Sequence, residues 1–171
     1  KNFKSLQVPT FDKAIDDRCS KSLWHKIKTK PDVLIFEGWC VGAKAQTSSQ
    51  LIKPINSLEK VYDQDAKWRT HVNNQLKTKY KTLFNQLDGL LYLKAKNFNL
   101  LRKWRLKQER KLLVHTKNKK NLRIMSSGDI LNFMQTYQRI TQQMFKDALI
   151  SSSIIVNLNS KHQIEKMKLK K

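Results

Sequence analysis

Three short apolar runs restrict the folds open to this chain more than any other feature of its sequence. They occupy residues 33–36, 90–93 and 153–158, and the first reads V-L-I-F without interruption. Such a run is typical of a strand that is buried on both faces of a parallel sheet. Longer segments with apolar side chains at helical spacing separate the runs. This alternation predicts an α/β domain with a mainly parallel sheet.

The segments around these runs complete the expected order of elements. Apolar side chains at helical spacing predict helices over residues 57–88 and 97–115, and a third helix from residue 126 onward. Residues 2–8 can form a short strand, and residues 116–121 form a Lys-rich loop. No internal repeat interrupts this order.

Length and cysteine usage set the domain organisation and the compartment. The 171 residues suffice for one domain with a hydrophobic core. We expect residues 1–160 to form that domain and residues 161–171 to form a basic C-terminal tail. The chain begins at Lys1 without an initiator Met, so we expect it to be part of a longer polypeptide. Two cysteines, Cys19 and Cys40, are too few for a disulfide scaffold and fit a reducing, cytoplasmic location.

The charge of the chain is strongly unbalanced. Lys and Arg number 35 against 13 Asp and Glu, which gives a formal net charge of +22. A polyanionic partner is one interpretation. The other is an AT-rich coding sequence, because the excess consists mainly of Lys rather than Arg. Composition alone leaves both interpretations open.

Several of the few acidic residues follow the expected strands, at the end of the sheet where α/β proteins bind their ligands. Asp12, Asp16 and Asp17 follow the first expected strand, with Lys13 and Arg18 between and beside them. Glu37 follows the run at 33–36. Ligands of open α/β sheets bind at the carboxyl ends of strands. Carboxylates beside cations there suit Mg²⁺ and a phosphorylated or anionic ligand. A solvated loop held by salt bridges is the alternative interpretation.

Several common site types have no matching motif. The four histidines and two cysteines show no zinc-ligand spacing, and no G-x-S-x-G nucleophile motif is present. A phosphate-binding P-loop reads G-x-x-x-x-G-K-[ST], because its backbone N–H groups must surround the phosphates. None of the four glycines begins that pattern.

Nucleic-acid binding has a weaker basis than the charge suggests. Trp104 lies between Lys103 and Arg105, as a base-stacking side chain might in a basic groove. The same tryptophan falls on the apolar stripe of its expected helix, which favours a packing role. The Lys-rich loop and the basic tail could contact phosphates without sequence preference.

Five segments, taken together, resemble one enzyme family. They read P-T-F-D-K followed by D-D-R, then V-L-I-F-E-G-W-C-V-G, P-I-N-S-L-E, W-R-L-K-Q-E and Y-Q-R-I-T. In this order they resemble motifs of the D-glycerate 3-kinase-like ATP-dependent kinases, which are P-loop kinases of the uridine kinase and phosphoribulokinase group. The resemblance implies a three-layer P-loop-kinase fold. It also implies that this chain is a C-terminal half that lacks the N-terminal strand, P-loop and helix.

The resemblance assigns a role to individual residues. It implies that Glu37 lies near Mg²⁺ and that Glu37, Asp12 and Arg105 serve catalysis, with Arg105 on a mobile lid. Lys13, Asp17 and Arg18 would bind the acceptor, and Arg139 would approach the nucleotide. Two alternatives come from helical spacing alone. Arg105 could pair with Glu109 at i, i+4, and Arg139 could lie on a solvated helix face.

The sequence is therefore compatible with three functions. The first is an ATP-dependent kinase that phosphorylates a hydroxyl of a small anionic acceptor, with D-glycerate as the expected acceptor and ATP and Mg²⁺ as cofactors. This chain alone would be inactive, because it lacks the phosphate cradle. The second is a noncatalytic remnant or subunit that needs a partner half. The third is a basic nucleic-acid-binding module.

Overall fold

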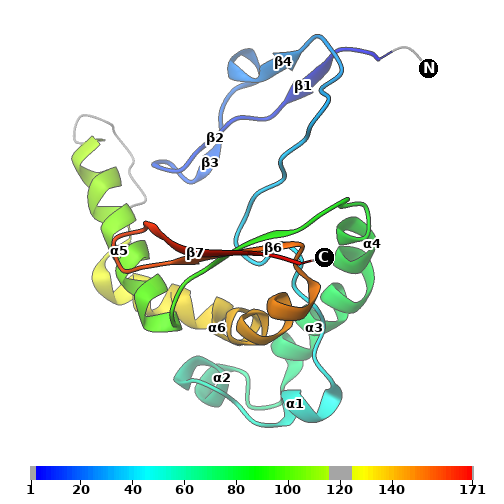
Figure 1. Ribbon diagram of the computed structural model, residues 1–171. Helices are drawn as coiled ribbons and strands as arrows, with labels where there is room; N and C mark the ends of the chain where they lie inside the picture. Colours follow the sequence, from blue (N-terminus) through cyan, green and yellow to red (C-terminus); the bar gives the residue numbers. More distant parts are fainter. Residues whose placement is uncertain (1–2, 116–124, 171) are drawn as a thin grey trace.

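The computed structural model describes residues 3–115 and 125–170, which form helices packed on a small sheet and a separate pair of N-terminal hairpins (Figure 1). In chain order the N-terminal elements are β1 (Leu6–Val8), β2 (Phe11–Asp12), β3 (Asp17–Arg18), η1 (Lys21–Leu23) and β4 (His25–Ile27). The remaining elements are α1 (Ser48–Ile52), α2 (Ser57–Tyr62), α3 (Lys67–Gln75), the π-helical turn η2 (Leu76–Tyr80), α4 (Lys81–Phe84), β5 (Leu91–Lys94), α5 (Phe98–His115), α6 (Ser127–Ser151), β6 (Ile154–Leu158) and β7 (Ile164–Leu169).

The sheet of the main body has the strand order β5-β6-β7. β5 and β6 are parallel, with Leu91 opposite Ile154, and β7 adds to the other edge of β6 in the antiparallel direction. The α/β class predicted from the apolar runs is confirmed. Residues 161–171, expected as a basic tail, supply β7, whose lysines are compatible with an exposed edge strand.

Helix α6 organises the core beneath the sheet. A capping box at its start joins Ser126 and Asp129, each side chain accepting a backbone N–H of the other residue. Ile130 and Met134, one turn apart, are 1% and 0% exposed. Farther along, Met144 belongs to a cluster with Ala43 and Leu76. The helix predicted from the apolar stripe is therefore confirmed, and its buried face is the one that the stripe indicated.

The long helix expected over residues 57–88 is instead divided into shorter helices. α2 ends at Tyr62 and α3 begins at Lys67, with Ala66 in the left-handed region at φ 57°. The break occurs where the side chain of Asp63 accepts the backbone N–H groups of Trp68 and Arg69. This carboxylate caps α3 and competes with continuation of the helix.

Residues 33–36 do not form the buried strand that their sequence predicts. The side chains of Val33, Leu34 and Ile35 are 76%, 82% and 84% exposed, and the segment is extended coil. A strand requires a neighbouring strand for its N–H and C=O groups, and within the described residues nothing pairs with this segment. The prediction was wrong because an apolar run indicates only a tendency to be buried.

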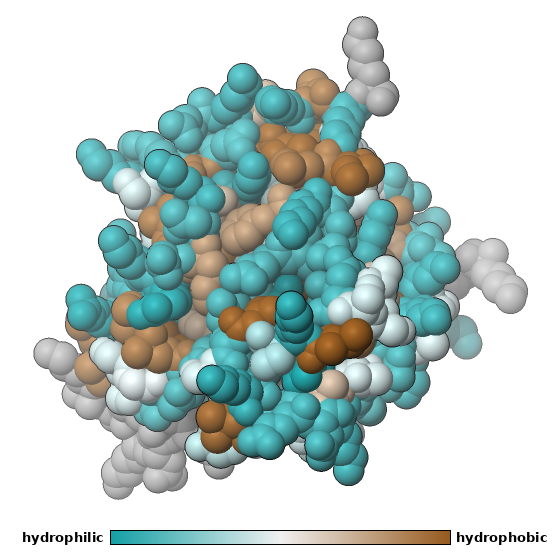
Figure 2. All heavy atoms as spheres, turned by 90° about the horizontal axis from the view of Figure 1, so that it is seen from below, coloured by the Kyte–Doolittle hydropathy of each residue, from teal (hydrophilic) through white to brown (hydrophobic). Residues whose placement is uncertain are grey.

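The N-terminal hairpins lie apart from the sheet in Figure 1. β1 pairs with β4, and β2 pairs with β3, both in the antiparallel direction. Helices lie below and beside the sheet, whereas the extended segment that follows β4 reaches it from above. Seen from below, the outer side of the helix layer is mostly hydrophilic, with separate hydrophobic patches (Figure 2).

Candidate functional site

The β2–β3 hairpin gathers the four residues expected around the acceptor. Asp12 and Asp17 lie opposite each other in the ladder, and Arg18 lies opposite Phe11. Lys13 is exposed in the connecting turn. The Asp12 carboxylate accepts the N–H of Ala14 at 2.9 Å, which holds the turn. With Asp16 in the turn, the hairpin thus presents three carboxylates and two cations within a few residues of one another.

Glu37 is exposed in the loop that follows residues 33–36. The described part of the chain contains no group of three or more His, Cys, Asp or Glu side chains that could hold a metal ion. Mg²⁺ is usually held by one or two carboxylates together with waters and substrate phosphates. A single exposed carboxylate such as Glu37 fits that mode of binding, whereas the residues that the structure describes form no closed protein cage for the ion.

A continuous row of side chains connects the loop after Glu37 to helix α5. The Trp39 ring stacks on Tyr137 with centroids 5.1 Å apart, and Tyr137 contacts Phe133 at the same separation. The guanidinium of Arg105 lies over the Phe133 ring at 5.6 Å. We call these four residues the aromatic row. It brings together three segments that the family resemblance singled out separately.

The loop end of the aromatic row is fixed by hydrogen bonding. The Trp39 indole N–H donates to the hydroxyl of Thr141 at 3.1 Å. Tyr137 and Thr141 are four residues apart on α6, so both face the same way and hold one indole between them. This attachment positions the loop that carries Glu37.

Arg105 is paired with Glu109 across one turn of α5, as the spacing alternative predicted. Glu109 is only 5% exposed, and its Oε2 atom has no hydrogen-bond partner. A buried carboxylate with one free oxygen depends heavily on its single cation. Arg105 therefore has a structural role in this arrangement, and a catalytic role would require it to leave Glu109.

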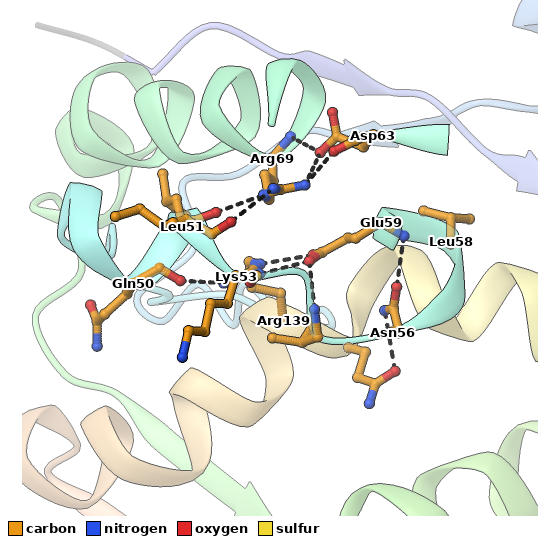
Figure 3. A network of polar contacts seen from close by, with 12 residues as sticks. Gln50, Leu51, Lys53, Asn56, Leu58, Glu59, Asp63, Arg69 and Arg139 are labelled. Atoms are coloured by element: carbon orange, nitrogen blue, oxygen red, sulfur yellow. Dashed lines mark hydrogen bonds and ion pairs between the residues drawn. The ribbon is translucent and has the colours of Figure 1, made fainter. Parts of the chain in front are cut away.

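Arg139 is buried in an ion pair and does not lie on a solvated face. Its guanidinium donates to both carboxylate oxygens of Glu59, at 2.8 and 2.6 Å (Figure 3). It also donates to the carbonyl oxygens of Gln50 and Lys53. These contacts fasten α1 and α2 to α6. Nucleotide binding by Arg139 stays a prediction, and this network would have to open to permit it.

A second buried pair lies close to the first in Figure 3. Arg69 and Asp63 are joined at 3.0 Å, and the Arg69 guanidinium also donates to the carbonyl oxygens of Leu51 and Ile52. A cavity of about 340 Å³ lies between α2, α3 and α6, and both ion pairs contribute to its lining. The two arginines thus tie the same short helix, α1, to two different parts of the helix layer.

The Asp63–Arg69 pair makes the free energy of unfolding depend on pH in the acidic range. Burial alone would raise the pKa of Asp63, but the N–H groups of Trp68 and Arg69 and the Arg69 charge outweigh burial and lower it. A lowered pKa contributes stability that is present above the unfolded value of about 3.9 and is lost as pH falls toward the folded value.

We expect Asp63→Asn to lower the free energy of unfolding at pH 7 by about 3 kcal/mol, because it leaves the Arg69 cation buried without its counter-ion. The parent protein should lose stability as pH falls below about 4, and the variant should lose less. Denaturant unfolding from pH 7 to pH 3 measures both effects. Equal acid dependence in the two proteins would contradict this role for Asp63.

Cys40 is a partly buried thiol beside the aromatic row. Burial, only partly offset by a hydrogen bond with Thr141, raises the pKa of Cys40 to about 11. Because the thiolate is the nucleophile, the reactive fraction at pH 8 is about one in a thousand. The neighbouring Tyr92 is also partly buried, and the loss of solvent around its hydroxyl raises its pKa to about 12.

We therefore expect Cys40 to react slowly with a disulfide reagent such as DTNB in the folded protein. In the Cys19→Ser variant, which keeps only Cys40, the rate should rise about tenfold per pH unit between pH 7 and 10. After unfolding in guanidinium chloride the same thiol should react at the rate of a free cysteine. Fast reaction in the folded variant would show that the loop does not cover Cys40.

A polar cavity occurs at the carboxyl end of β5. Its volume is about 480 Å³, and it lies between the end of the strand, the start of α5 and the exposed side of α6. Lys94 and Lys96 supply two cations, Phe98 and Phe145 supply two rings, and its remaining lining side chains are amides. The lining includes no carboxylate, so the cavity is suited to a small anion with hydroxyl groups.

Sequence reasoning missed Asp63, Arg69 and Thr141 as structural partners. Glu59 was within a quoted motif, but its pairing with Arg139 was not anticipated. The sequence did contain a signal for this pairing. The motifs P-I-N-S-L-E and Y-Q-R-I-T each carry a charged side chain, Glu59 and Arg139, and each of the two needs a partner of opposite charge when it is buried. Asn56, from the first motif, donates to the Gln135 carbonyl oxygen and to Gln138 on α6.

Trp104 makes contacts within the protein, in agreement with its expected packing role. Its ring stacks on His162 with centroids 4.1 Å apart, and its indole N–H donates to the carbonyl oxygen of Ser160. The lysines of the expected loop at 116–121 lie outside the described residues. Among the helices that the structure describes, none is long and apolar enough to cross a membrane.

Comparison with known proteins finds a sequence relative and solved structures that resemble this chain. No family model matches the sequence. A protein of Schizosaccharomyces pombe, the uncharacterized kinase mug58, is 27% identical over 160 residues, which cover 90% of this chain and 54% of that protein. This chain thus spans about half the length of the curated relative that it matches.

Two solved structures share the fold. The D-glycerate 3-kinase of Cryptococcus neoformans var. grubii superposes with a TM-score of 0.74 and 19% identity over 97% of this chain and 60% of its own. The YGR205w protein gives a TM-score of 0.59 and 20% identity, with 98% and 59% covered. The resemblance drawn from the sequence motifs is confirmed at the level of the fold, and this chain matches about 60% of each of the two solved chains.

Proposed function

We propose that this chain forms part of an ATP-dependent kinase that transfers a phosphoryl group to a hydroxyl of a small anionic acceptor, with D-glycerate as the first candidate. The observation that supports this most is the fold shared with a D-glycerate 3-kinase over 97% of the chain. The relative from fission yeast is also named as a kinase.

The candidate site supports this chemistry through charge. Phosphoryl transfer depends on positioning and on neutralising the developing negative charge more than on covalent chemistry by the protein. We assign Lys13 and Arg18 to the acceptor's anionic group, and Asp12 and Asp17 to its hydroxyl groups. The Lys94 and Lys96 cavity offers a second anion-binding position near a strand end.

Glu37 would hold Mg²⁺ together with the nucleotide phosphates, and the ion would supply charge neutralisation. The Trp39 anchor holds the loop that carries this carboxylate. This chain contains no P-loop, so the backbone cradle for the phosphates must come from polypeptide outside these 171 residues. ATP and Mg²⁺ are thus proposed as cofactors of the completed enzyme.

The test compares the 171-residue chain with the polypeptide isolated from its native source. We expect ATP-dependent phosphorylation of D-glycerate by a polypeptide of about twice this mass, at typical kinase rates of about 1–100 per second. The 171-residue chain alone should show no turnover above background. Turnover by the short chain at a kinase-like rate would refute the need for a separate phosphate cradle.

Other acceptors and other functions give different results in the same assay. Phosphorylation of a different hydroxy acid or sugar would keep the kinase and change the acceptor. A native polypeptide that binds neither ATP nor acceptor would favour the noncatalytic subunit.

Two cysteines without a disulfide in the described structure accord with the cytoplasmic location that we propose.

A further inference from the structure

The cavity between α2, α3 and α6 has a largely apolar wall. Its volume is about 340 Å³, within the range of about 300–1,000 Å³ that small-molecule sites occupy. Its apolar lining consists of Leu51, Leu58, Trp68, Val72, Leu76 and Ile140. Leu51 and Leu76 are buried, whereas Trp68 and Val72 are 64% and 41% exposed. The cavity is therefore closed toward the core, and solvent reaches it from the side of α3.

The two arginines in the wall of this cavity are committed to the protein. Each guanidinium nitrogen of Arg139 donates to Glu59 or to the carbonyl oxygens of residues 50 and 53. Each guanidinium nitrogen of Arg69 donates to Asp63 or to the carbonyl oxygens of residues 51 and 52 (Figure 3). These four carbonyls belong to the end of α1, where helical carbonyls lack a partner within the helix. The arginines thus complete the wall, and buried carboxylates neutralise their charges.

The amide side chains of the lining are also in use. The side chain of Asn73 accepts the N–H of Gln46 and donates to its carbonyl oxygen. The side-chain amide of Gln46 donates to Gln143, which donates in turn to Asp147. A ligand that broke these bonds would leave partly buried polar groups unpaired, at a cost in affinity. The enclosed part of a ligand must therefore be apolar.

Lys44 contributes a free cation to the same lining. Its side chain is exposed, and among the residues that the structure describes it has neither an ion pair nor a hydrogen bond. The two carboxylates of the lining, Glu59 and Asp63, are held by their arginines and do not compete for it. An ammonium group beside an apolar cavity favours a ligand that carries one anionic group.

We propose that this cavity binds a small hydrophobic carboxylic acid. Its hydrocarbon part lies among the apolar side chains, with the flat Trp68 ring as one wall, and its carboxylate pairs with Lys44. The bound acid contacts α2, α3 and α6 together and stabilises the helix layer by mass action. The site involves neither Glu37 nor the β2–β3 hairpin, so the inference goes beyond the proposed kinase activity and does not depend on it.

The experiment titrates the full chain with naphthylacetate and, separately, with the neutral isostere naphthylacetamide. The readout is the NMR signal of the Trp68 indole N–H, which is identified by its absence in Trp68→Phe. We expect naphthylacetate to shift this signal at a ratio of one molecule per chain, with a dissociation constant below about 1 mM. The amide should bind about fivefold more weakly, because it forms no ion pair with an exposed lysine.

A matched pair of variants tests whether the cavity is the binding site. Val72→Phe adds a ring to the lining and should weaken binding of both probes by at least about tenfold, because overpacking of this kind is costly. Val61→Phe makes the same change on α2 at a side chain that is 54% exposed and does not line the cavity. It should bind both probes as the parent protein does. Thermal melting of both variants shows that they are folded.

Lys44→Met tests the role of the cation. This change keeps an unbranched side chain and removes its charge. We expect naphthylacetate to lose its advantage over naphthylacetamide of about fivefold, while the affinity of the amide stays the same.

Four results would overturn the proposal. They are an unshifted Trp68 signal with both probes, undiminished binding by folded Val72→Phe, an undiminished preference for the acid in Lys44→Met, and binding of several naphthylacetate molecules per chain. The last result would show adsorption of an anion to a surface of net charge +22. None of these readouts involves phosphoryl transfer, so a failure of the proposed kinase activity and a failure of this inference are distinguishable.

Discussion

Replacing Arg139 by Met should destabilise the protein by about 3–5 kcal/mol, because it leaves the Glu59 carboxylate buried without its cation. Glu59 and Arg139 are 6% and 8% exposed, and two hydrogen bonds join them. The guanidinium also satisfies carbonyl oxygens of residues 50 and 53, which would lose their partner. For a chain of this length, the melting temperature should fall by about 10 °C.

Two further variants make this measurement specific. Lys146→Met changes an exposed cation on the same helix and should change the free energy of unfolding by less than about 0.5 kcal/mol. The double variant Glu59→Leu/Arg139→Met removes both charges and should recover much of the loss, because no isolated charge remains. A double variant as unstable as the sum of the two single variants would show that the pair itself contributes little.

If Arg105 contacts the transferring phosphoryl group in the proposed kinase, replacing it by Met in the full-length polypeptide should lower kcat by about 10³-fold, because arginines in that role contribute on this scale. The same change leaves Glu109 buried without a cation, so stability should also fall. Activity must therefore be measured on protein shown to be folded by circular dichroism at the assay temperature.

The double variant Arg105→Met/Glu109→Met separates the structural and catalytic roles of Arg105. It removes the buried carboxylate together with its cation and should restore thermal stability. If Arg105 acts on the phosphoryl group, kcat should stay low in this stable double variant. Recovery of kcat along with stability would show that Arg105 acts only by neutralising Glu109.

Elements with strong local patterns could be predicted from the sequence. The stripe that includes Ile130 and Phe133 indicated α6, and the apolar runs indicated β5 and β6. The expected start of this helix, residue 126, lies one residue before the first residue of α6. These predictions succeeded because the geometry of a single helix or strand imposes a periodic pattern of buried residues. That pattern can be recognised in neighbouring residues of the sequence.

Predictions that depended on a distant partner succeeded less often. Residues 33–36 have the composition of a strand, but no strand pairs with them in the described structure. Helical spacing alone placed Arg139 on a solvated face, whereas it pairs with Glu59, 80 residues away in the sequence. The burial of Arg139 resulted from the packing of α1 and α2 against that side.

The sequence by itself determined the α/β class, the main helices and strands and, through five motifs, the resemblance to a kinase family. Only the tertiary structure decided which of those motif residues contact one another. It joined Glu59 to Arg139 and assembled the aromatic row from three separate segments. The physical reason is that hydrophobic periodicity is a local property of the chain. The partner of a buried charge or an apolar edge depends on how whole elements cross in space.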